Sequence, residues 1–397
     1  MKNLLLVGVA VSTLFMVSCN NELESNLSNA ESKLQTKVIE KSIEVSDVAQ
    51  LISMVEIDDE IMNEVKMNTE YSRKYGLDEE YRFTDMIKPN ESKIYRSDHE
   101  SALIRKMRIE YENQNSNELC SNFFESLANT DIQIYWPYSE NWDHSEKPII
   151  VYGSEDGKFV YQIKQDNNKC LIDTISISDK YLKENTIWII SMNNTSYEEL
   201  PDFYNNEFVN KDGVVFLSKY ASEKMNENRM SRKAEVGVYL DKIEALHSFE
   251  GGLAGGPELQ FIWCHGGGLS LITPTTGFVN TYRYNMTLSE VGQPVQLNYR
   301  IRPYWPNEEI TNVLVVLEKD GGKERTGTRN IKYKDMFGKE ITLTSTFKYQ
   351  KNDDTIFDEV FEQKKICGED NYTVGGELKQ YKNKDRDFWV TIAVQNN

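Results

Sequence analysis

The sequence predicts a mainly β protein with an α-helical N-terminal region, a small β-containing middle domain and a C-terminal antiparallel β-sandwich. Three observations predict this fold class. The chain has 397 residues, which is enough for more than one domain. Apolar residues recur at helical spacing in the stretch before residue 130. After residue 131 they recur at every second position, in short runs separated by Gly-, Asn- and Asp-bearing turns.

The first 18 residues have the features of a secretory signal peptide. Lys2 precedes a largely apolar run of 14 residues, 4–17, which is followed by Ser18. This run is shorter than the roughly 20 residues that a helix needs to cross a bilayer. A charged start and a small residue at the cut are typical of secretory signals. We therefore expect residues 1–18 to be absent from the mature fold.

Residues 16–19 resemble a bacterial lipobox, in which the cysteine thiol receives diacylglycerol and signal peptidase II cuts just before it. Cys19 is thus the predicted lipidation site, although Met16 stands where Leu is commoner. At roughly 0.8 kcal/mol per buried methylene, two acyl chains such as palmitate give durable anchoring. The alternative is a buried or disulfide-bonded Cys19 behind an ordinary signal peptide. Glu22 and Glu24 resemble the acidic tether that directs some lipoproteins to the outer face of the outer membrane.

The charge of the chain excludes one class of partner. With 63 acidic and 45 basic side chains, the net charge is −18. Such a field repels a polyanion, so we expect no nucleic-acid partner. Residues 20–130 alone carry −10. The acidity is thus concentrated next to the predicted lipid and suggests a charged stalk rather than a ligand site.

The N-terminal part divides into a tether and a helical region. Residues 19–45 are rich in Asn, Ser, Glu and Lys, which predicts a flexible acidic tether. The region 46–130 is predicted to be helical. Its first helix begins with Ser46 or Asp47 as N-cap and has Gly76 beyond its end, and a second runs over residues 99–111.

The rest of the chain is predicted to be β-rich. Residues 131–220 contain four or five short strands, residues 221–235 are polar and predict a linker, and residues 236–397 predict the sandwich. In the stretch 341–349, alternate residues make one largely apolar face and one polar face, as in a half-buried strand.

Besides Cys19, four cysteines lie in the chain, and two interpretations of them stay open. Domain proximity favours the pairs Cys120–Cys170 and Cys264–Cys367, because an exported chain can form disulfides. The other interpretation is four reduced, buried thiols. Their spacing gives no zinc signature.

Two clusters are candidate binding sites. Asp353, Asp354, Asp358 and Glu359 lie within seven residues and are a candidate calcium site, since loops of a sandwich can bring carboxylates together. Solvated charge on hairpin tips is the alternative. The aromatic residues Trp136, Tyr138, Trp142 and Trp305 are a candidate platform for sugar rings, or else anchors of the core.

No complete catalytic motif is present. The run 265–268, His-Gly-Gly-Gly, resembles the oxyanion element of some esterases, but no GxSxG follows, and His265 is the last of four histidines. The histidines form no HExxH pair either. We therefore predict no catalytic residues and no cofactor apart from the candidate calcium.

Three sequence segments, at residues 131–142, 186–190 and 250–258, resemble those of a group of uncharacterised outer-membrane lipoproteins from gut-type Gram-negative bacteria. Members of that group have a C2-like or β-sandwich C-terminal domain. The resemblance implies an outer-membrane, lipid-anchored location, at the cell surface or on the periplasmic face, and brings no reaction.

Three functional hypotheses follow. The first is a lipid-anchored envelope protein with a non-catalytic binding or display role and a glycan or envelope-protein partner. The others are an exported glycosidase or peptidase with a dispersed active site, and a carbohydrate-binding surface lipoprotein. A hydrolase needs a pocket holding ionisable groups in perturbed environments. The oligomeric state is not determined by the sequence.

Overall fold

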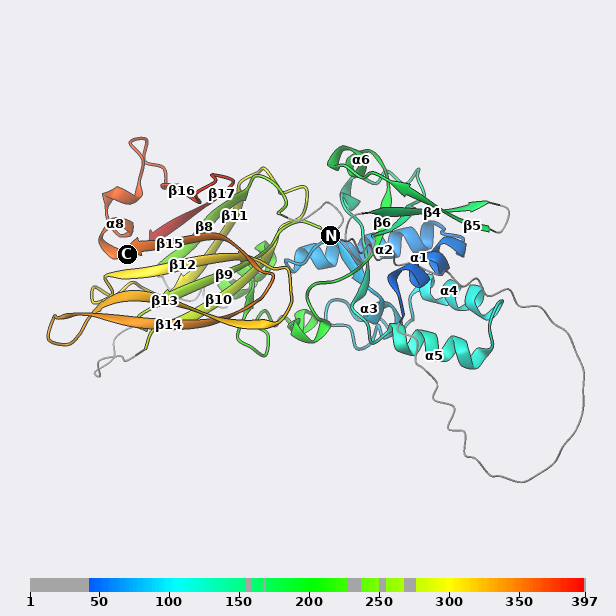
Figure 1. The fold of residues 1–397 in the computed structure, drawn as a ribbon, viewed down its shortest axis with the longest axis horizontal. Coiled ribbons are helices and arrows are strands. Elements are labelled where there is room, and N and C mark those ends of the chain that lie inside the picture. Colours follow the sequence, from blue (N-terminus) through cyan, green and yellow to red (C-terminus); the bar gives the residue numbers. More distant parts are fainter. Residues whose placement is uncertain are drawn as a thin grey trace, which may run out of the picture. The chain divides into compact units, whose positions relative to one another are not determined.

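A computed structural model describes residues 43–153, 159–166, 169–227, 237–249, 255–267 and 276–395 (Figure 1). Within these ranges the chain is mainly β, with an N-terminal helical region and antiparallel, sandwich-like sheets, which confirms the predicted fold class. The predicted signal peptide, the lipidation site Cys19 and nearly all of the tether lie outside the described residues. None of the helices in the described ranges is long and apolar enough to cross a membrane.

Five helices make up the N-terminal region. They are α1 (Val45–Met54), α2 (Asp59–Lys74), α3 (Phe83–Ile87), α4 (Ala102–Glu112) and α5 (Asn117–Leu127). The apolar stripe that predicted one helix is divided between α1 and α2, because Asp58 accepts a hydrogen bond from the Ile61 amide and starts a new helix. The N-cap of α1 is Glu44, in a capping box with Asp47, rather than Ser46.

Six strands form a mixed sheet behind these helices. Their order is β1 (Glu80–Arg82), β2 (Ile132–Tyr135), β6 (Ile187–Met192), β3 (Ile149–Gly153), β4 (Val160–Asp166) and β5 (Lys169–Ile175). Neighbours are antiparallel except β6 and β3, which are parallel. Along β6, Trp188 and Ile190 pack with the helices, whereas Ile187 and Ile189 pack on the other face beside α6 (Asp179–Glu184). Burial on both faces explains the unbroken apolar run of this strand.

The predicted helical region and the predicted small β domain fold together. Strand β1 comes from the region expected to be purely helical, and one core cluster contains side chains of α1, α2, α4, α5 and the sheet. The apolar face of the sheet must be covered, and the N-terminal helices cover it. Residues 130 and 131 are therefore not separated by a domain boundary.

Two further sheets pack face to face as the sandwich. The first has the order β15 (Asp354–Glu362), β12 (Thr311–Glu318), β9 (Glu258–His265), β10 (Phe278–Asn285) and β7 (Val215–Phe216). The second has the order β11 (Val295–Arg302), β8 (Gly237–Ala245), β17 (Phe388–Gln395) and β16 (Tyr381–Lys382). One apolar cluster joins their inner faces. The short helix α8 (Gln363–Ile366) follows β15.

A long hairpin adds a third layer. Strands β13 (Glu324–Lys334) and β14 (Glu340–Gln350) pair along their whole length and pack against the outer face of the first sandwich sheet. Leu343, Ser345 and Phe347 of β14 are buried, whereas the alternate threonines are exposed, which confirms the predicted alternation over residues 341–349.

The predicted linker begins within a helix. Helix α7 (Lys219–Glu227) covers the first seven residues of the segment 221–235. Ala221 is fully buried in a cluster with Phe203 and Phe216, and the Ser218 hydroxyl accepts a hydrogen bond from the Ala221 amide. The polar composition of the segment concealed this packed helix, because Ala221 and Met225 are the apolar residues of its described part that pack against the core.

Gly76 makes a close turn between α2 and the sandwich. Its φ is +80°, and a Cβ at this position would lie 1.9 Å from the carbonyl oxygen of Leu217. The backbone amide of Asn285 donates to the Gly76 carbonyl at 3.4 Å, and the backbone amide of Leu217 donates to the Arg283 carbonyl at 2.7 Å. The end of α2, the start of α7 and the end of β10 therefore meet at this glycine, which needs both its left-handed backbone and its missing side chain.

We predict that Gly76→Ala destabilises the protein more than Gly213→Ala does. Gly213 has almost the same φ, +79°, but a Cβ there meets nothing within 4 Å. The control should therefore cost only the left-handed strain, about 1–2 kcal/mol, and Gly76→Ala should cost roughly 1–3 kcal/mol more because of overpacking. Urea unfolding of both variants measures the difference. Equal losses would contradict the close packing at Gly76.

Candidate functional site

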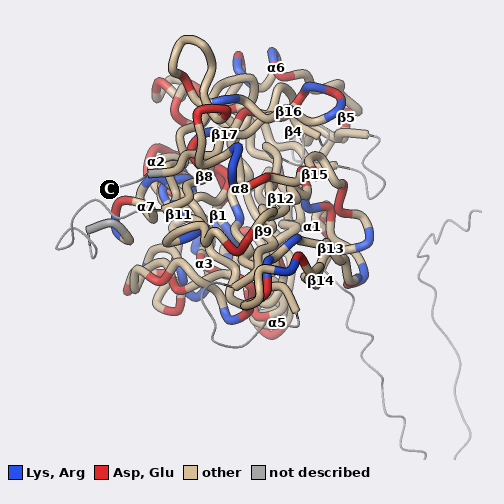
Figure 2. The backbone as a smooth tube through the Cα atoms, turned by 90° about the vertical axis from the view of Figure 1, so that its left-hand side faces the viewer, with Lys and Arg blue, Asp and Glu red and all other residues tan. Residues whose placement is uncertain are grey.

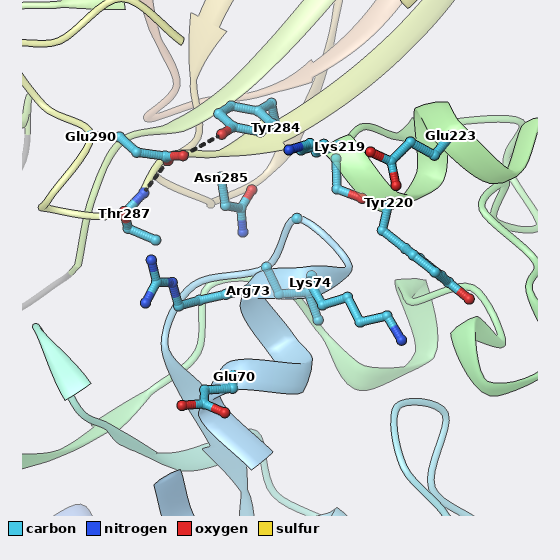
Figure 3. Close-up of a pocket in the computed structure, with 13 residues that line it drawn as sticks. Glu70, Arg73, Lys74, Lys219, Tyr220, Glu223, Tyr284, Asn285, Thr287 and Glu290 are labelled. Carbon is cyan, nitrogen blue, oxygen red and sulfur yellow. Dashed lines mark hydrogen bonds between the residues drawn. The ribbon is translucent and has the colours of Figure 1, made fainter. Parts of the chain in front are cut away.

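A polar cavity of about 620 Å³ lies around the Gly76 turn (Figure 3). Three segments line it: the end of α2 with the turn that follows, the start of α7, and the end of β10 with the loop after it. The segments are far apart in sequence and come together through the backbone hydrogen bonds at Gly76. Figure 2 shows acidic and basic residues interspersed over the face it presents, so the net charge makes no single patch there.

Asn285 supplies a hydrogen-bond donor to this cavity. Its side chain is 3% exposed, and its Oδ1 accepts a hydrogen bond from Arg283 Nε at 3.3 Å. Its Nδ2 has no acceptor among the described residues, and Figure 3 shows the amide pointing into the middle of the cavity. Asn285 is therefore a largely buried residue with one donor open to the cavity, where water or a ligand can accept a hydrogen bond.

Arg73 is held at the edge of the cavity by two carboxylates behind it. Its Nη1 donates to Glu140 Oε2 at 3.0 Å and lies 3.6 Å from Glu79 Oε1. Burial, together with the neighbouring Glu140, raises the pKa of Glu79 to about 9, whereas the pKa of Glu140 is lowered. Burial therefore favours the neutral form of Glu79, and the two carboxyl groups together orient the guanidinium.

Each oxygen of Glu290 already accepts a hydrogen bond within the chain. Its Oε1 accepts a hydrogen bond from the Tyr284 hydroxyl at 2.8 Å, and its Oε2 accepts one from the Thr287 amide at 3.0 Å. Burial and the adjacent Glu290 raise the pKa of Tyr284 well above its usual value. This trio closes one side of the cavity, as the dashed lines in Figure 3 show.

The remaining charged residues lie at the other sides. The ammonium of Lys74 lies over the Tyr220 ring, 4.1 Å from its centroid. Lys219, Glu70 and Glu223 have no hydrogen-bond or ion-pair partner in the described part of the chain. Since no histidine or cysteine is among the lining residues, the described arrangement contains neither a thiol nucleophile nor an imidazole base. What it offers chemically is hydrogen bonding and charge for a bound molecule.

The prediction of an exposed aromatic platform for sugar rings is wrong, because all four side chains are buried. Trp136 is 1% exposed, Tyr138 6%, and Trp142 and Trp305 7% each. Trp136 and Trp142 pack edge to face with each other beneath the N-terminal helices, and Trp305 packs in the same way on Trp263 between the sandwich sheets. Large aromatic side chains gain most by burial, and that gain decided their position.

The predicted calcium site at Asp353, Asp354, Asp358 and Glu359 is not assembled. Asp353 is buried and forms an ion pair with Lys319 at 2.6 Å, and Asp358 makes a bidentate pair with Arg329. Alternation along β15 then directs neighbouring side chains to different faces. In the described ranges, no three His, Cys, Asp or Glu residues form a group that could hold a metal ion.

The two candidate disulfides, Cys120–Cys170 and Cys264–Cys367, are not formed. Cys264 is buried between the first sandwich sheet and the hairpin, whereas Cys367 packs against the cluster between the two sandwich sheets. Burial raises the pKa of the Cys264 thiol to about 12, so this thiol is unreactive.

His265 lies at the end of β9 and is buried. Its Nδ1 accepts a hydrogen bond from the Gly267 amide at 3.0 Å, and burial with the adjacent Arg302 lowers its pKa to about 3. The imidazole is therefore neutral and accepts a hydrogen bond within the turn that follows β9. Residue 268 of that run lies outside the described residues.

Sequence analysis missed the residues of the cavity. Arg73, Lys219 and Asn285 belong to three segments and form no motif. The only signal was Gly76, which was correctly expected beyond the end of a helix. Comparison of the chain with protein-family models, with curated proteins and with solved structures finds no match.

The carboxylate pair behind Arg73 predicts a pH dependence of stability. Glu79 binds its proton up to a pH of about 9 in the folded chain, against 4.5 for an unperturbed carboxyl. Because the folded state binds more protons in this window, the free energy of unfolding should fall as the pH rises through it. Glu79→Gln keeps a neutral side chain at every pH, so its slope should be shallower than that of the wild type.

Urea unfolding between pH 5 and pH 9 measures this slope. Glu125→Gln, at an exposed position on α5, is the matched control and should keep the slope of the wild type. A Glu79→Gln protein with an unchanged slope would show that Glu79 is ionised in the folded chain.

Proposed function

We propose that this chain is an exported, lipid-anchored envelope protein with a non-catalytic binding role, and that the cavity at Gly76 holds a small polar ligand. Support for the anchor comes from the lipobox-like residues 16–19 and their resemblance to outer-membrane lipoproteins. Support for the binding role comes from the cavity. The observation that carries it is Asn285, a residue that is 3% exposed and whose side-chain Nδ2 points into the cavity without an acceptor in the described part of the chain.

The surroundings of Asn285 are those of a binding site rather than of a reaction centre. Glu79, the carboxyl group with a raised pKa next to the cavity, has a fully buried side chain. It accepts hydrogen bonds from the Tyr138 and Ser139 amides and from the Ser139 hydroxyl. Those contacts hold it behind Arg73, out of reach of a substrate. A general acid must reach the atom that it protonates, so Glu79 serves here to orient Arg73.

We predict that Cys19 carries the lipid. In a Gram-negative host fed an alkyne-bearing fatty acid, the wild-type chain should be labelled and should sediment with the membrane fraction. Cys19→Ser should lose the label, because no thioether to diacylglycerol can form. Cys367→Ser, which removes a half-buried thiol elsewhere, should keep it. An unlabelled wild-type chain, or a label retained by Cys19→Ser, would contradict the anchor.

We also predict that a small polar solute stabilises the protein through Asn285. A ligand stabilises the folded state by RT ln(1 + [L]/Kd), which is about 2.7 kcal/mol at a concentration of 100 Kd. Thermal unfolding with a panel of monosaccharides, amino acids, carboxylates, phosphates and amines should give at least one class that raises the wild-type midpoint.

That rise should be absent in Asn285→Ala. If no class distinguishes the two proteins, the cavity is not a binding site. Chemical analysis of the panel after incubation tests the hydrolase hypothesis, because turnover of any member would show that the role is catalytic.

A further inference from the structure

The cavity presents unpaired donors where a ligand would lie. Asn285 Nδ2 has no acceptor, and of the guanidinium nitrogens of Arg73 only Nη1 has a hydrogen-bond partner. Both side chains line the cavity (Figure 3). Nδ2 can only donate, and a guanidinium has no acceptor atom. A group that satisfies both must therefore bring hydrogen-bond acceptors, which an oxyanion supplies in number.

The start of α7 adds positive charge to this space. Ser218 and Lys219 line the cavity, and the helix that begins there has nine residues. Its first amides carry part of the positive end of the helix dipole. The Lys219 ammonium has no partner in the described part of the chain. Together with Arg73, this arrangement favours a negatively charged group.

The acidic residues of the cavity do not form a competing cation site. Both oxygens of Glu290 already accept hydrogen bonds. Glu70 on α2 and Glu223 on α7 lie on opposite sides of the cavity in Figure 3, with the two basic residues of α2 between them. Their charges would repel a ligand with many negative charges. The charge pattern thus fits one oxyanion group on a small molecule.

We propose that the cavity binds a carboxylate or phosphate group of its ligand, with Asn285 Nδ2, Arg73 and Lys219 as the donors. This inference rests on the proposed binding role of the cavity and names the chemical class that it takes. The Asn285 amide fixes the position of the oxyanion, since its Oδ1 is held by Arg283. The two basic side chains supply the charge.

Asn285→Asp is the decisive variant. It keeps the oxygen that accepts the hydrogen bond from Arg283 Nε, and it replaces the donor with a negative charge. The probes are inorganic phosphate, succinate and glycerol phosphate, each titrated calorimetrically into the purified full chain at constant ionic strength. Loss of a charge-assisted hydrogen bond should weaken binding about tenfold or more.

Two control variants keep the net charge matched. Asn113→Asp adds the same charge at an exposed position at the end of α4 and should bind the probes as the wild type does. Lys219→Gln should weaken binding, whereas Lys334→Gln, exposed on the hairpin, should not.

The probes also distinguish the origin of the bound oxyanion. Preference for glycerol phosphate over inorganic phosphate would identify a lipid headgroup as its source, and the reverse preference would identify a soluble anion.

Methylammonium and glucose complete the experiment. If either of them binds in an Asn285-dependent manner and the three anions do not, the oxyanion inference is wrong while the binding role stands. If Asn285→Asp binds the anions as the wild type does, the inference is also wrong. If the wild type binds none of the three anions, methylammonium or glucose, both the inference and the proposed function fail.

Discussion

The structure depends on three consecutive buried carboxylates that follow the Gly76 turn. Asp78, Glu79 and Glu80 are at most 6% exposed, and burial of such groups is tolerated only when each is hydrogen-bonded. Each finds its partner in a different part of the chain. Asp78 accepts from the Gly256 amide before β9, Glu79 accepts from the amides of residues 138 and 139, and Glu80 accepts from the Asn193 side chain after β6. The six-stranded sheet, the end of α2 and the sandwich are therefore tied together by one acidic segment.

The cavity is a consequence of this segment. The turn that buries the three carboxylates also directs Arg73 toward β10, and Glu79 with Glu140 orients its guanidinium. Leu217 and Asn285 approach Gly76 closely, and this contact forms the floor of the cavity. A site of this kind consists of side chains held by buried hydrogen bonds, which is what preorganised binding requires. The raised pKa of Glu79 links the stability of this floor to pH.

Sequence patterns predicted the elements better than the sites. The helical spacing before residue 130 and the alternation over 341–349 report burial directly, because helices and strands repeat at fixed periods. The candidate sites were inferred from unusual local composition, and composition does not say on which side of a sheet a residue lies. The aromatic cluster around Trp136 packs inside the fold, and in the acidic cluster Asp353 is buried with Lys319, whereas Asp354, Asp358 and Glu359 are exposed.

The sequence by itself determined the mainly β architecture, the helical region at its start and the glycine that ends α2. These follow from short-range rules of periodicity and capping. Only the tertiary structure decided that the helices and the first sheet share one core, that Cys264 and Cys367 lie in different clusters, and that Arg73, Lys219 and Asn285 line one cavity. The physical reason is that these relations depend on contacts between segments up to about two hundred residues apart, which local patterns do not encode.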